Sequence, residues 1–197
     1  WFECYFIYMD KINPEKIGKV LAVGGEHLIR EYGQFYVIKT PVGIRHALQH
    51  KANVRWVARD YIATKRYFGN FVLEAEIIFS ADSYAIVQKK VDPRPLTIDA
   101  LKTNPKIKDD FLRICKNNKK LIEHENMSWD FYGAMGLLRP RARVLNNLVV
   151  ANGRLKMIDL GLMHLAKRQQ HWLIYLITNW AFSRQKKFLK KVLKEVL

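Results

Sequence analysis

Asn147-Leu148-Val149-Val150 and, after a turn, Lys156-Met157-Ile158-Asp159-Leu160-Gly161 form the stretch that decides the expected fold of this chain of 197 residues. Two β-rich runs joined by Ala151-Asn152-Gly153 predict a hairpin. The carboxamide of Asn147 at its mouth and the carboxylate of Asp159 just past its far end can then face one point. Oxygen ligands of this kind suit Mg²⁺, which takes one or two protein carboxylates beside substrate phosphates.

The residues before this hairpin predict a sheet interrupted by one helix. Three short antiparallel strands are expected between Lys16 and Thr40, with Gly24-Gly25 in the turn between the first two. After Gly43 the spacing becomes helical, with apolar residues recurring at three and four residues over 54–62, and this helix should end near Phe68-Gly69. Two further strands are expected, over 71–79 and 84–88.

The composition changes after Val91. Asp92-Pro93-Arg94-Pro95 is typical of a linker. Helices are predicted over 97–101 and 106–127, followed by the hairpin, and residues 164–197 predict one or two terminal helices.

Three positions, Lys39, Asn147 and Asp159, make the sequence resemble the protein-kinase-like superfamily. Val37-Ile38-Lys39 is similar to the third-strand lysine motif, and Asp159-Leu160-Gly161 to the Asp-Phe-Gly triplet. The resemblance implies an α+β, bilobal protein-kinase-like fold. It would have an antiparallel five-stranded N-lobe with one helix over residues 1–91, and a minimal, mostly helical C-lobe over residues 92–197.

The same resemblance implies ATP and Mg²⁺ as cofactors. Lys39 would bind the α- and β-phosphates, and Asn147 and Asp159 would hold the metal. Gly24 and Gly25 would approach the phosphates through main-chain N–H groups, although the full Gly-x-Gly-x-x-Gly motif is not present.

Two further residues complete the nucleotide site that the resemblance implies. Gln88 and the residues after it would form the hinge that faces adenine through main-chain groups. Asp60 stands at about the separation from Lys39 at which kinases place a helix glutamate, so it would steady the lysine. Its alternative is an ordinary surface pair with a neighbouring residue of its helix.

The catalytic loop departs most from the family pattern. The catalytic Asp of the family lies five residues before the metal-binding Asn, and Ala142 occupies that position here. Asp130 is the candidate substitute, with the alternative that it caps its own turn. Arg139, Arg141 and Arg143 could neutralise a transferring phosphate or bind an acidic substrate.

Composition limits the remaining classes. A formal net charge of +16 attracts acidic partner surfaces or nucleic acid without choosing between them. Cys4 and Cys115 fit no metal-ligand spacing, which favours free thiols in a reducing compartment. No apolar run is long enough for a transmembrane segment. A cytoplasmic location is therefore expected.

The resemblance implies an ATP- and Mg²⁺-dependent phosphotransferase, an atypical kinase, whose acceptor is an unidentified protein or small molecule. The first alternative is a pseudokinase that binds partners without catalysis, which Ala142 favours. The second is a basic nucleic-acid-binding protein, which rests on the charge alone.

Overall fold

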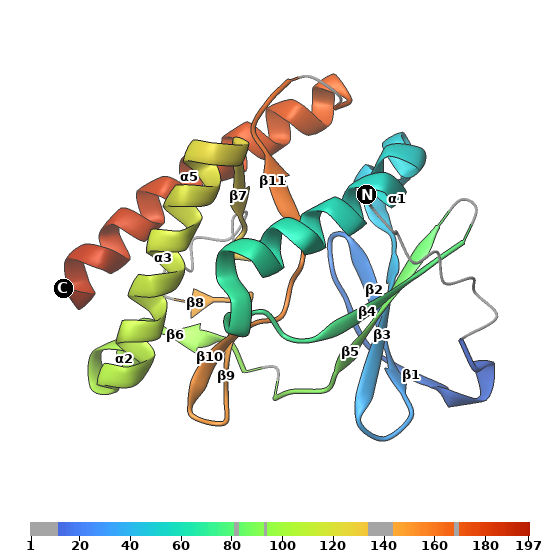
Figure 1. Cartoon of the computed structure of the whole chain (residues 1–197), viewed down its shortest axis with the longest axis horizontal. Helices are drawn as coiled ribbons and strands as arrows, with labels where there is room; N and C mark the ends of the chain where they lie inside the picture. The colour runs from blue at the N-terminus through green and yellow to red at the C-terminus, as the bar shows by residue number, and fades with distance from the viewer. Residues whose placement is uncertain (1–11, 81–82, 93, 134–143, 168–169) are drawn as a thin grey trace. The chain divides into compact units, whose positions relative to one another are not determined.

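The computed structural model describes residues 12–80, 83–92, 94–133, 144–167 and 170–197, and its elements are labelled in Figure 1. The chain folds as two compact units. Each unit is made of two segments of the chain. The first unit consists of the residues up to Ala58 together with Glu74–Lys90, and the second consists of Arg59–Leu73 together with Val91–Leu197. The division expected between residues 91 and 92 lies one residue from an observed boundary, but residues 59–73 pack with the second unit.

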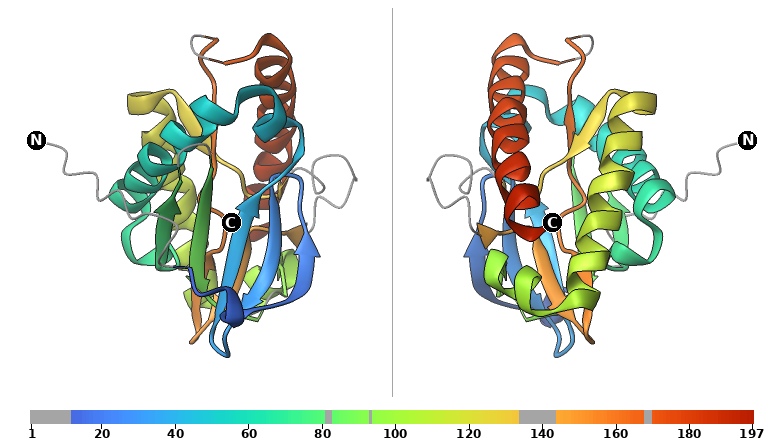
Figure 2. Two further views of the ribbon diagram at one scale, coloured as in Figure 1. Left: turned by 90° about the vertical axis from the view of Figure 1, so that its right-hand side faces the viewer. Right: turned by 90° about the vertical axis from the view of Figure 1, so that its left-hand side faces the viewer.

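The first unit is built on a five-stranded antiparallel sheet with the strand order β1-β2-β3-β5-β4. Figure 2 shows its strands side by side from two directions. Its elements are the short 3₁₀ helix η2 (Pro14–Lys16), β1 (Ile17–Val23), β2 (His27–Tyr32), β3 (Tyr36–Pro41), β4 (Ala75–Phe79), β5 (Tyr84–Lys89) and the first part of α1 (Gly43–Phe68).

One face of this sheet carries the core of the first unit. Ile38, Ile78, Ala85 and Val87 are buried together on it. Because side chains alternate along a strand, Lys39 in β3 points to the opposite face from its neighbour Ile38.

The second unit combines helices with short strand pairs. Besides the last part of α1, it contains η3 (Gly69–Phe71), β6 (Leu96–Thr97), α2 (Ile98–Thr103), α3 (Pro105–Glu125), β7 (Met127–Trp129), β8 (Val144–Leu145), β9 (Leu148–Ala151), β10 (Arg154–Met157), β11 (Leu162–His164) and α5 (Trp172–Val196). The strands pair antiparallel as β6–β8, β9–β10 and β7–β11. Figure 2 shows α5 as one unbroken helix, so the terminal segment forms one helix.

The core of the second unit is aromatic. Trp129 packs edge-to-face on Phe131, with 4.9 Å between ring centroids, and Phe131 packs in the same way on Phe111 of α3. Phe68 at the end of α1 completes the cluster against Trp129. All four side chains are buried, and aromatic pairs of this kind stabilise a core beyond the area they bury.

Helix α3 shows how the sequence sets an element's limits. The side chain of Asn104 accepts hydrogen bonds from the N–H groups of Lys106 and Ile107, and Pro105 occupies the first turn, where its missing N–H costs nothing. Asn126 ends the helix in a left-handed conformation, with φ 52°.

Some boundaries agree with those expected and others differ. Helix α1 begins at Gly43 and ends at Phe68, as the change of spacing after Gly43 and the expected end near Phe68-Gly69 predicted. Strand β4 begins at Ala75, since residues 69–71 form a 3₁₀ turn. Strands β7 and β11 were not predicted, and neither exceeds three residues.

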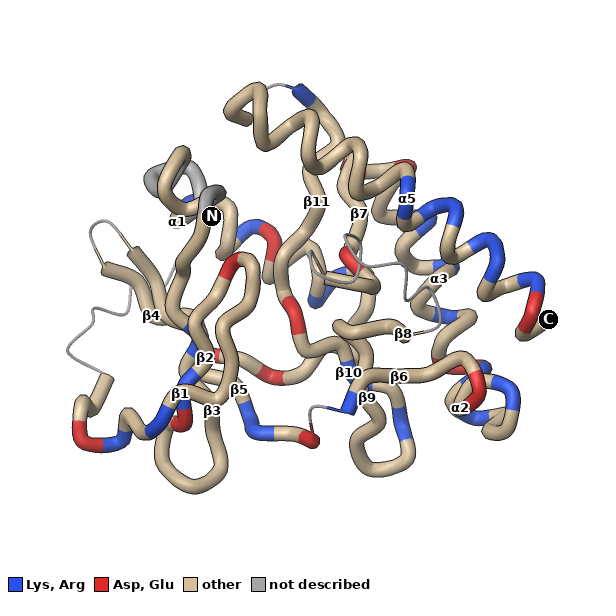
Figure 3. Tube along the Cα trace, turned by 180° about the vertical axis from the view of Figure 1, so that it is seen from behind, with Lys and Arg blue, Asp and Glu red and all other residues tan. Residues whose placement is uncertain are grey.

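The basic residues are spread over several elements of the described chain, as Figure 3 shows. The C-terminal half of α5 is one concentration, with Lys186, Lys187, Lys190, Lys191 and Lys194. None of the helices described here is both long and apolar enough to cross a membrane.

Candidate functional site

The β9–β10 hairpin positions the candidate metal ligands. Its turn residues Asn152 and Gly153 both have positive φ, 52° and 67°, the conformation of the tight turn that favours Asn-Gly. Leu148 pairs with Met157, and the N–H of Ile158 donates to the carbonyl oxygen of Asn147 at 3.1 Å. The pairing therefore continues to the open end of the hairpin, where Asn147 and Asp159 stand.

The side chains of Asn147 and Asp159 are close enough to act together. The Nδ2 of Asn147 lies 3.4 Å from Oδ2 of Asp159 and donates to the main-chain oxygen of Asp130 at 2.7 Å. The other carboxylate oxygen of Asp159 accepts from the N–H of Gly161. These contacts use both hydrogens of the amide, which leaves Oδ1 of Asn147 and the lone pairs of the carboxylate as acceptors.

This donor set fits Mg²⁺ and not a metal enclosed by protein alone. Within the described part of the chain there is no group of three or more His, Cys, Asp or Glu side chains that could hold a metal ion. One carboxylate and one carboxamide oxygen, both half-buried, match the way in which Mg²⁺ is bound together with substrate phosphates.

Asp130 lies beside this pair, although it is 17 residues from Asn147 in sequence. It directly follows β7, and its Oδ1 accepts from the N–H groups of Tyr132 and Gly133 at 2.9 Å each. The carboxylate therefore caps its own turn, which is one of the two roles predicted for Asp130. Ala142 and Arg139, Arg141 and Arg143 lie outside the described residues.

Buried polar side chains hold the strand that leads to Asp130. Asn118 of α3 accepts from the N–H of Trp129 at 2.8 Å through Oδ1. Gln185 of α5 accepts from the N–H of Phe131 at 2.9 Å and donates to the carbonyl oxygen of Trp129 at 2.8 Å. Because β7 pairs with β11 on one side only, these two side chains satisfy main-chain groups that no other strand reaches.

The segment after Asp159 is fixed to the last part of α1. Leu160 is buried, and the indole N–H of Trp129 donates to the carbonyl oxygen of Asp159 at 2.9 Å. Asp60 accepts from the N–H of Leu162 at 3.4 Å and is bonded to Nε2 of His164 at 2.9 Å. Asp60 therefore anchors the strand that follows the metal-site carboxylate.

His164 is a residue that sequence reasoning missed, since residues 164–197 were taken as helix. It is buried in β11, and its second ring nitrogen lies 3.1 Å from a guanidinium nitrogen of Arg59. The pairing of Asp60 with Lys39 stays a prediction, because the two residues belong to different units.

Lys39 lies in β3 of the first unit, opposite Ile29 of β2 and Ile86 of β5. Only 8% of it is exposed. A buried ammonium group needs compensating partners, so this lysine is not an ordinary surface residue.

Gln88 shares a sheet face with Lys39. It pairs with Val37, which lies two residues before Lys39 in β3, and residues two apart on a strand point the same way. Gln88 is 2% exposed, and its Nε2 has no hydrogen-bond partner among the residues that the structure describes. The predicted hinge residue is thus an interior strand residue with a buried amide donor.

Gly24 and Gly25 form the turn between β1 and β2. The N–H of Gly24 donates to the carbonyl oxygen of His27 at 2.8 Å. Gly43 at the start of α1 has φ 84°, and a Cβ built there would lie 2.3 Å from the carbonyl oxygen of Gly25. The turn at Gly25 and the start of α1 at Gly43 therefore come close together because neither residue has a side chain. That the turn also binds phosphates stays a prediction.

The described cysteine offers no nucleophile. Burial raises the pKa of the Cys115 thiol to about 12, so the thiol stays protonated near neutral pH.

Comparisons with known proteins give a fold and no sequence family. No family model and no curated protein matches the chain. Among solved structures, it is similar to a kinase of Legionella pneumophila bound to IP6, with a TM-score of 0.50 and 15% identity. The match covers 87% of this chain but 58% of that one, so the chain spans under two thirds of its length.

A second solved structure is the ternary complex of streptomycin, ATP and APH(2'')-IIa, an aminoglycoside phosphotransferase. It has a TM-score of 0.36 and 14% identity, and the match covers 94% of this chain and 82% of that one. The fold assignment rests on the first match and on the strand order.

Proposed function

We propose that this chain, which has a protein-kinase-like fold, is an ATP- and Mg²⁺-dependent phosphotransferase. The observation that carries the proposal is the meeting of Asn147, Asp159 and Asp130 at the open end of the β9–β10 hairpin. A carboxamide and a carboxylate for the metal, with a further acidic residue whose main-chain oxygen accepts from the carboxamide, are the residue types that phosphoryl transfer uses.

Each of these residues has a distinct role. Asn147 and Asp159 would hold Mg²⁺, which when bound neutralises charge on the phosphates and orients them. The hydrogen bonds from Asn147 to Asp130 and from Gly161 to Asp159 fix the two side chains before any ligand arrives. Such preorganisation is the main contribution that a protein makes to this reaction.

Asp130 takes the role of general base in the proposal. It would accept the proton of the acceptor hydroxyl while the phosphoryl group moves. Its Oδ1 is held by Tyr132 and Gly133, so the position of the carboxylate is fixed by the turn. The side chain of Asn147 reaches the main chain of Asp130, which supports this residue, rather than Ala142, as the functional equivalent of the family's catalytic Asp.

The first unit would supply the groups for the nucleotide. Lys39 would bind the α- and β-phosphates, and Gly24 and Gly25 would offer main-chain N–H groups. Adenine would lie against the hinge after β5, and the buried amide of Gln88 is a donor available to it. Burial of Lys39 and its shared face with Gln88 support this arrangement.

The acceptor is an alcohol of unidentified class, in a protein or in a small molecule. The pseudokinase alternative drew its support from Ala142, and the position of Asp130 weakens that support. Among the described residues, no feature of the site favours nucleic-acid binding.

The test is transfer of the γ-phosphate of labelled ATP to water or to the protein itself, with Mg²⁺ present. The wild type should transfer label, Asp159→Asn should not, and Glu123→Gln, an exposed carboxylate on α3, should behave as the wild type. Equal background rates for the wild type and Asp159→Asn would favour the pseudokinase.

A further inference from the structure

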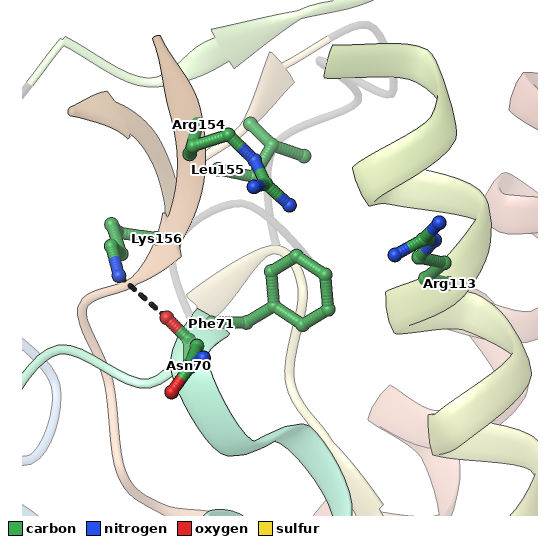
Figure 4. A pocket seen from close by; sticks show the side chains of 6 residues that line it. All are labelled: Asn70, Phe71, Arg113, Arg154, Leu155 and Lys156. Atoms are coloured by element: carbon green, nitrogen blue, oxygen red, sulfur yellow. Dashed lines mark hydrogen bonds between the residues drawn. The ribbon is translucent and has the colours of Figure 1, made fainter. Parts of the chain in front are cut away.

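A pocket in the second unit lies apart from the candidate metal site. Its volume is about 270 Å³, and Figure 4 shows the side chains that line it. They are Asn70, Phe71, Arg113, Arg154, Leu155 and Lys156. The volume lies just below the range of about 300–1,000 Å³ that is usual for drug-sized ligands, so the pocket suits a small ligand.

The charges in the wall of the pocket are all positive. Arg113, Arg154 and Lys156 contribute three cations, and no acidic residue lines the wall. Asp110 binds Arg154 with two hydrogen bonds of 2.6 and 2.7 Å, and Asp109 pairs with Arg113 at 3.0 Å. Three cations against two acids leave one net positive charge.

The cations also keep hydrogen-bond donors for a ligand. Arg154 uses Nε and Nη2 for Asp110, Arg113 uses Nε for Asp109, and Lys156 gives one bond, to the carbonyl oxygen of Asn70. The remaining guanidinium and ammonium N–H groups have no other partner among the described residues. The side chains of Arg113 and Arg154 are 62% and 45% exposed, so a ligand can reach them.

The pocket is firmly built on the side of Arg154. Asp110 is 1% exposed and also accepts from the N–H of Leu155 at 3.1 Å, which ties β10 to α3. Phe71 projects toward the middle of the pocket in Figure 4, between Arg154 and Arg113. An aromatic ring beside fixed cations suits an anion that also carries an apolar or ring-shaped skeleton.

The position of the pocket separates it from the metal pair. Arg154 begins β10, whereas Asp159 follows the end of the same strand. Five residues of extended chain at about 3.3 Å each span about 16 Å. Arg154 therefore stands at the far end of the strand from Asp159, and neither Asn147 nor Asp159 lines the pocket.

From these observations we infer a second anion site, which binds a small molecule with two or more phosphate groups. Arg113 and Lys156 make the contacts, Arg154 is the fixed cation between them, and Phe71 packs against the skeleton. The site is independent of the proposed nucleotide site and does not require catalysis.

Calorimetry on the whole chain with inorganic tripolyphosphate tests the inference, in EDTA so that no metal-dependent site contributes. The probe should bind with one-to-one stoichiometry and weaken with salt. The double variant Arg113→Gln/Lys156→Gln should bind at least about tenfold more weakly, since it removes two cations and their charge-assisted hydrogen bonds to the probe. The control Lys119→Gln/Lys120→Gln removes the same number of charges from α3, the helix that carries Arg113, and should bind the probe as the wild type does.

Two further variants keep the result unambiguous. Arg113→Gln alone changes an exposed side chain and should still lower the affinity several-fold. Lys19→Gln, an exposed change in the other unit, should leave binding unchanged. Equal losses in both double variants would reduce the effect to net charge and overturn the inference, as would an equal loss of binding in Lys19→Gln. Neither result would touch the proposed transferase.

Discussion

Replacing Gln185 by leucine should weaken the second unit, because this side chain is 1% exposed and serves main-chain groups that have no other partner strand. The change would leave the N–H of Phe131 unpaired and would remove the bonds of Gln185 to the carbonyl oxygen of Trp129 and to Oγ of Ser128, which itself donates to that oxygen at 3.2 Å. An unpaired buried group costs about 1–3 kcal/mol and each lost hydrogen bond about 0.5–1.5 kcal/mol, and burial of leucine returns part of this, so we expect a loss of about 2–4 kcal/mol.

Urea unfolding followed by tryptophan fluorescence measures this loss. With a denaturant dependence of about 2 kcal/mol per molar urea, the midpoint should fall by about 1–2 M. Ser183→Leu, at an exposed position on the same helix, is the control and should change stability by less than about 0.5 kcal/mol. If Gln185→Leu were no more destabilising than Ser183→Leu, the bonds to β7 would not hold the strand.

Three further predictions concern two glycines with positive φ, the carboxylate of Asp110 that ties β10 to α3, and the carboxylate of Asp130. Gly43→Ala should destabilise more than Gly33→Ala in thermal unfolding, since both positions have positive φ but only the Cβ at Gly43 would meet a carbonyl oxygen. Burial raises the pKa of Asp110, but the hydrogen bonds from Arg154 and from the N–H of Leu155, together with the charges of Arg154 and Arg113, outweigh burial and hold the pKa below its usual value. The stability that this carboxylate adds is then complete above the unfolded pKa of about 3.9 and is lost as the pH falls through the lower folded value. Unfolding from pH 6 to pH 2 should show the wild type losing its advantage over Asp110→Asn at acidic pH, and a constant difference would contradict this. Asp130→Asn should lower kcat for phosphoryl transfer by roughly 10²–10⁴, the usual contribution of a general base, with KM for ATP nearly unchanged, and an unchanged kcat would exclude Asp130 as the base.

Local patterns in the sequence predicted the parts of the site that depend on neighbouring residues. The Asn-Gly turn and its β-rich flanks specify a hairpin, so the meeting of Asn147 and Asp159 follows from a segment of 13 residues. Lys39 was placed correctly on a third strand for the same reason, since strand, turn and strand alternate clearly before it.

Long-range contacts could not be predicted in the same way. Strands β7 and β11 have three residues each and pair across more than 30 positions, so neither carries a periodic signal of its own. The proposed role of Asp130 depends on this pairing. Counting five residues back from Asn147 leads to Ala142, a count that holds only for a loop of the family's length.

The partner of Asp60 is a second case. The separation of Asp60 from Lys39 in sequence suggested one ion pair, but no local pattern indicated that His164 would contact the same helix. A lone histidine in a segment expected to be helical indicates neither a strand nor a partner. Only the fold brings Asp60 within 2.9 Å of it.

Calorimetric titration of ATP, with and without Mg²⁺, tests most directly whether Asn147 and Asp159 bind a metal–nucleotide complex. In the wild type, Mg²⁺ should strengthen ATP binding at least about tenfold, or 1.4 kcal/mol, and Asp159→Asn should abolish this gain. An ATP affinity that is the same with and without Mg²⁺ in the wild type would contradict the account.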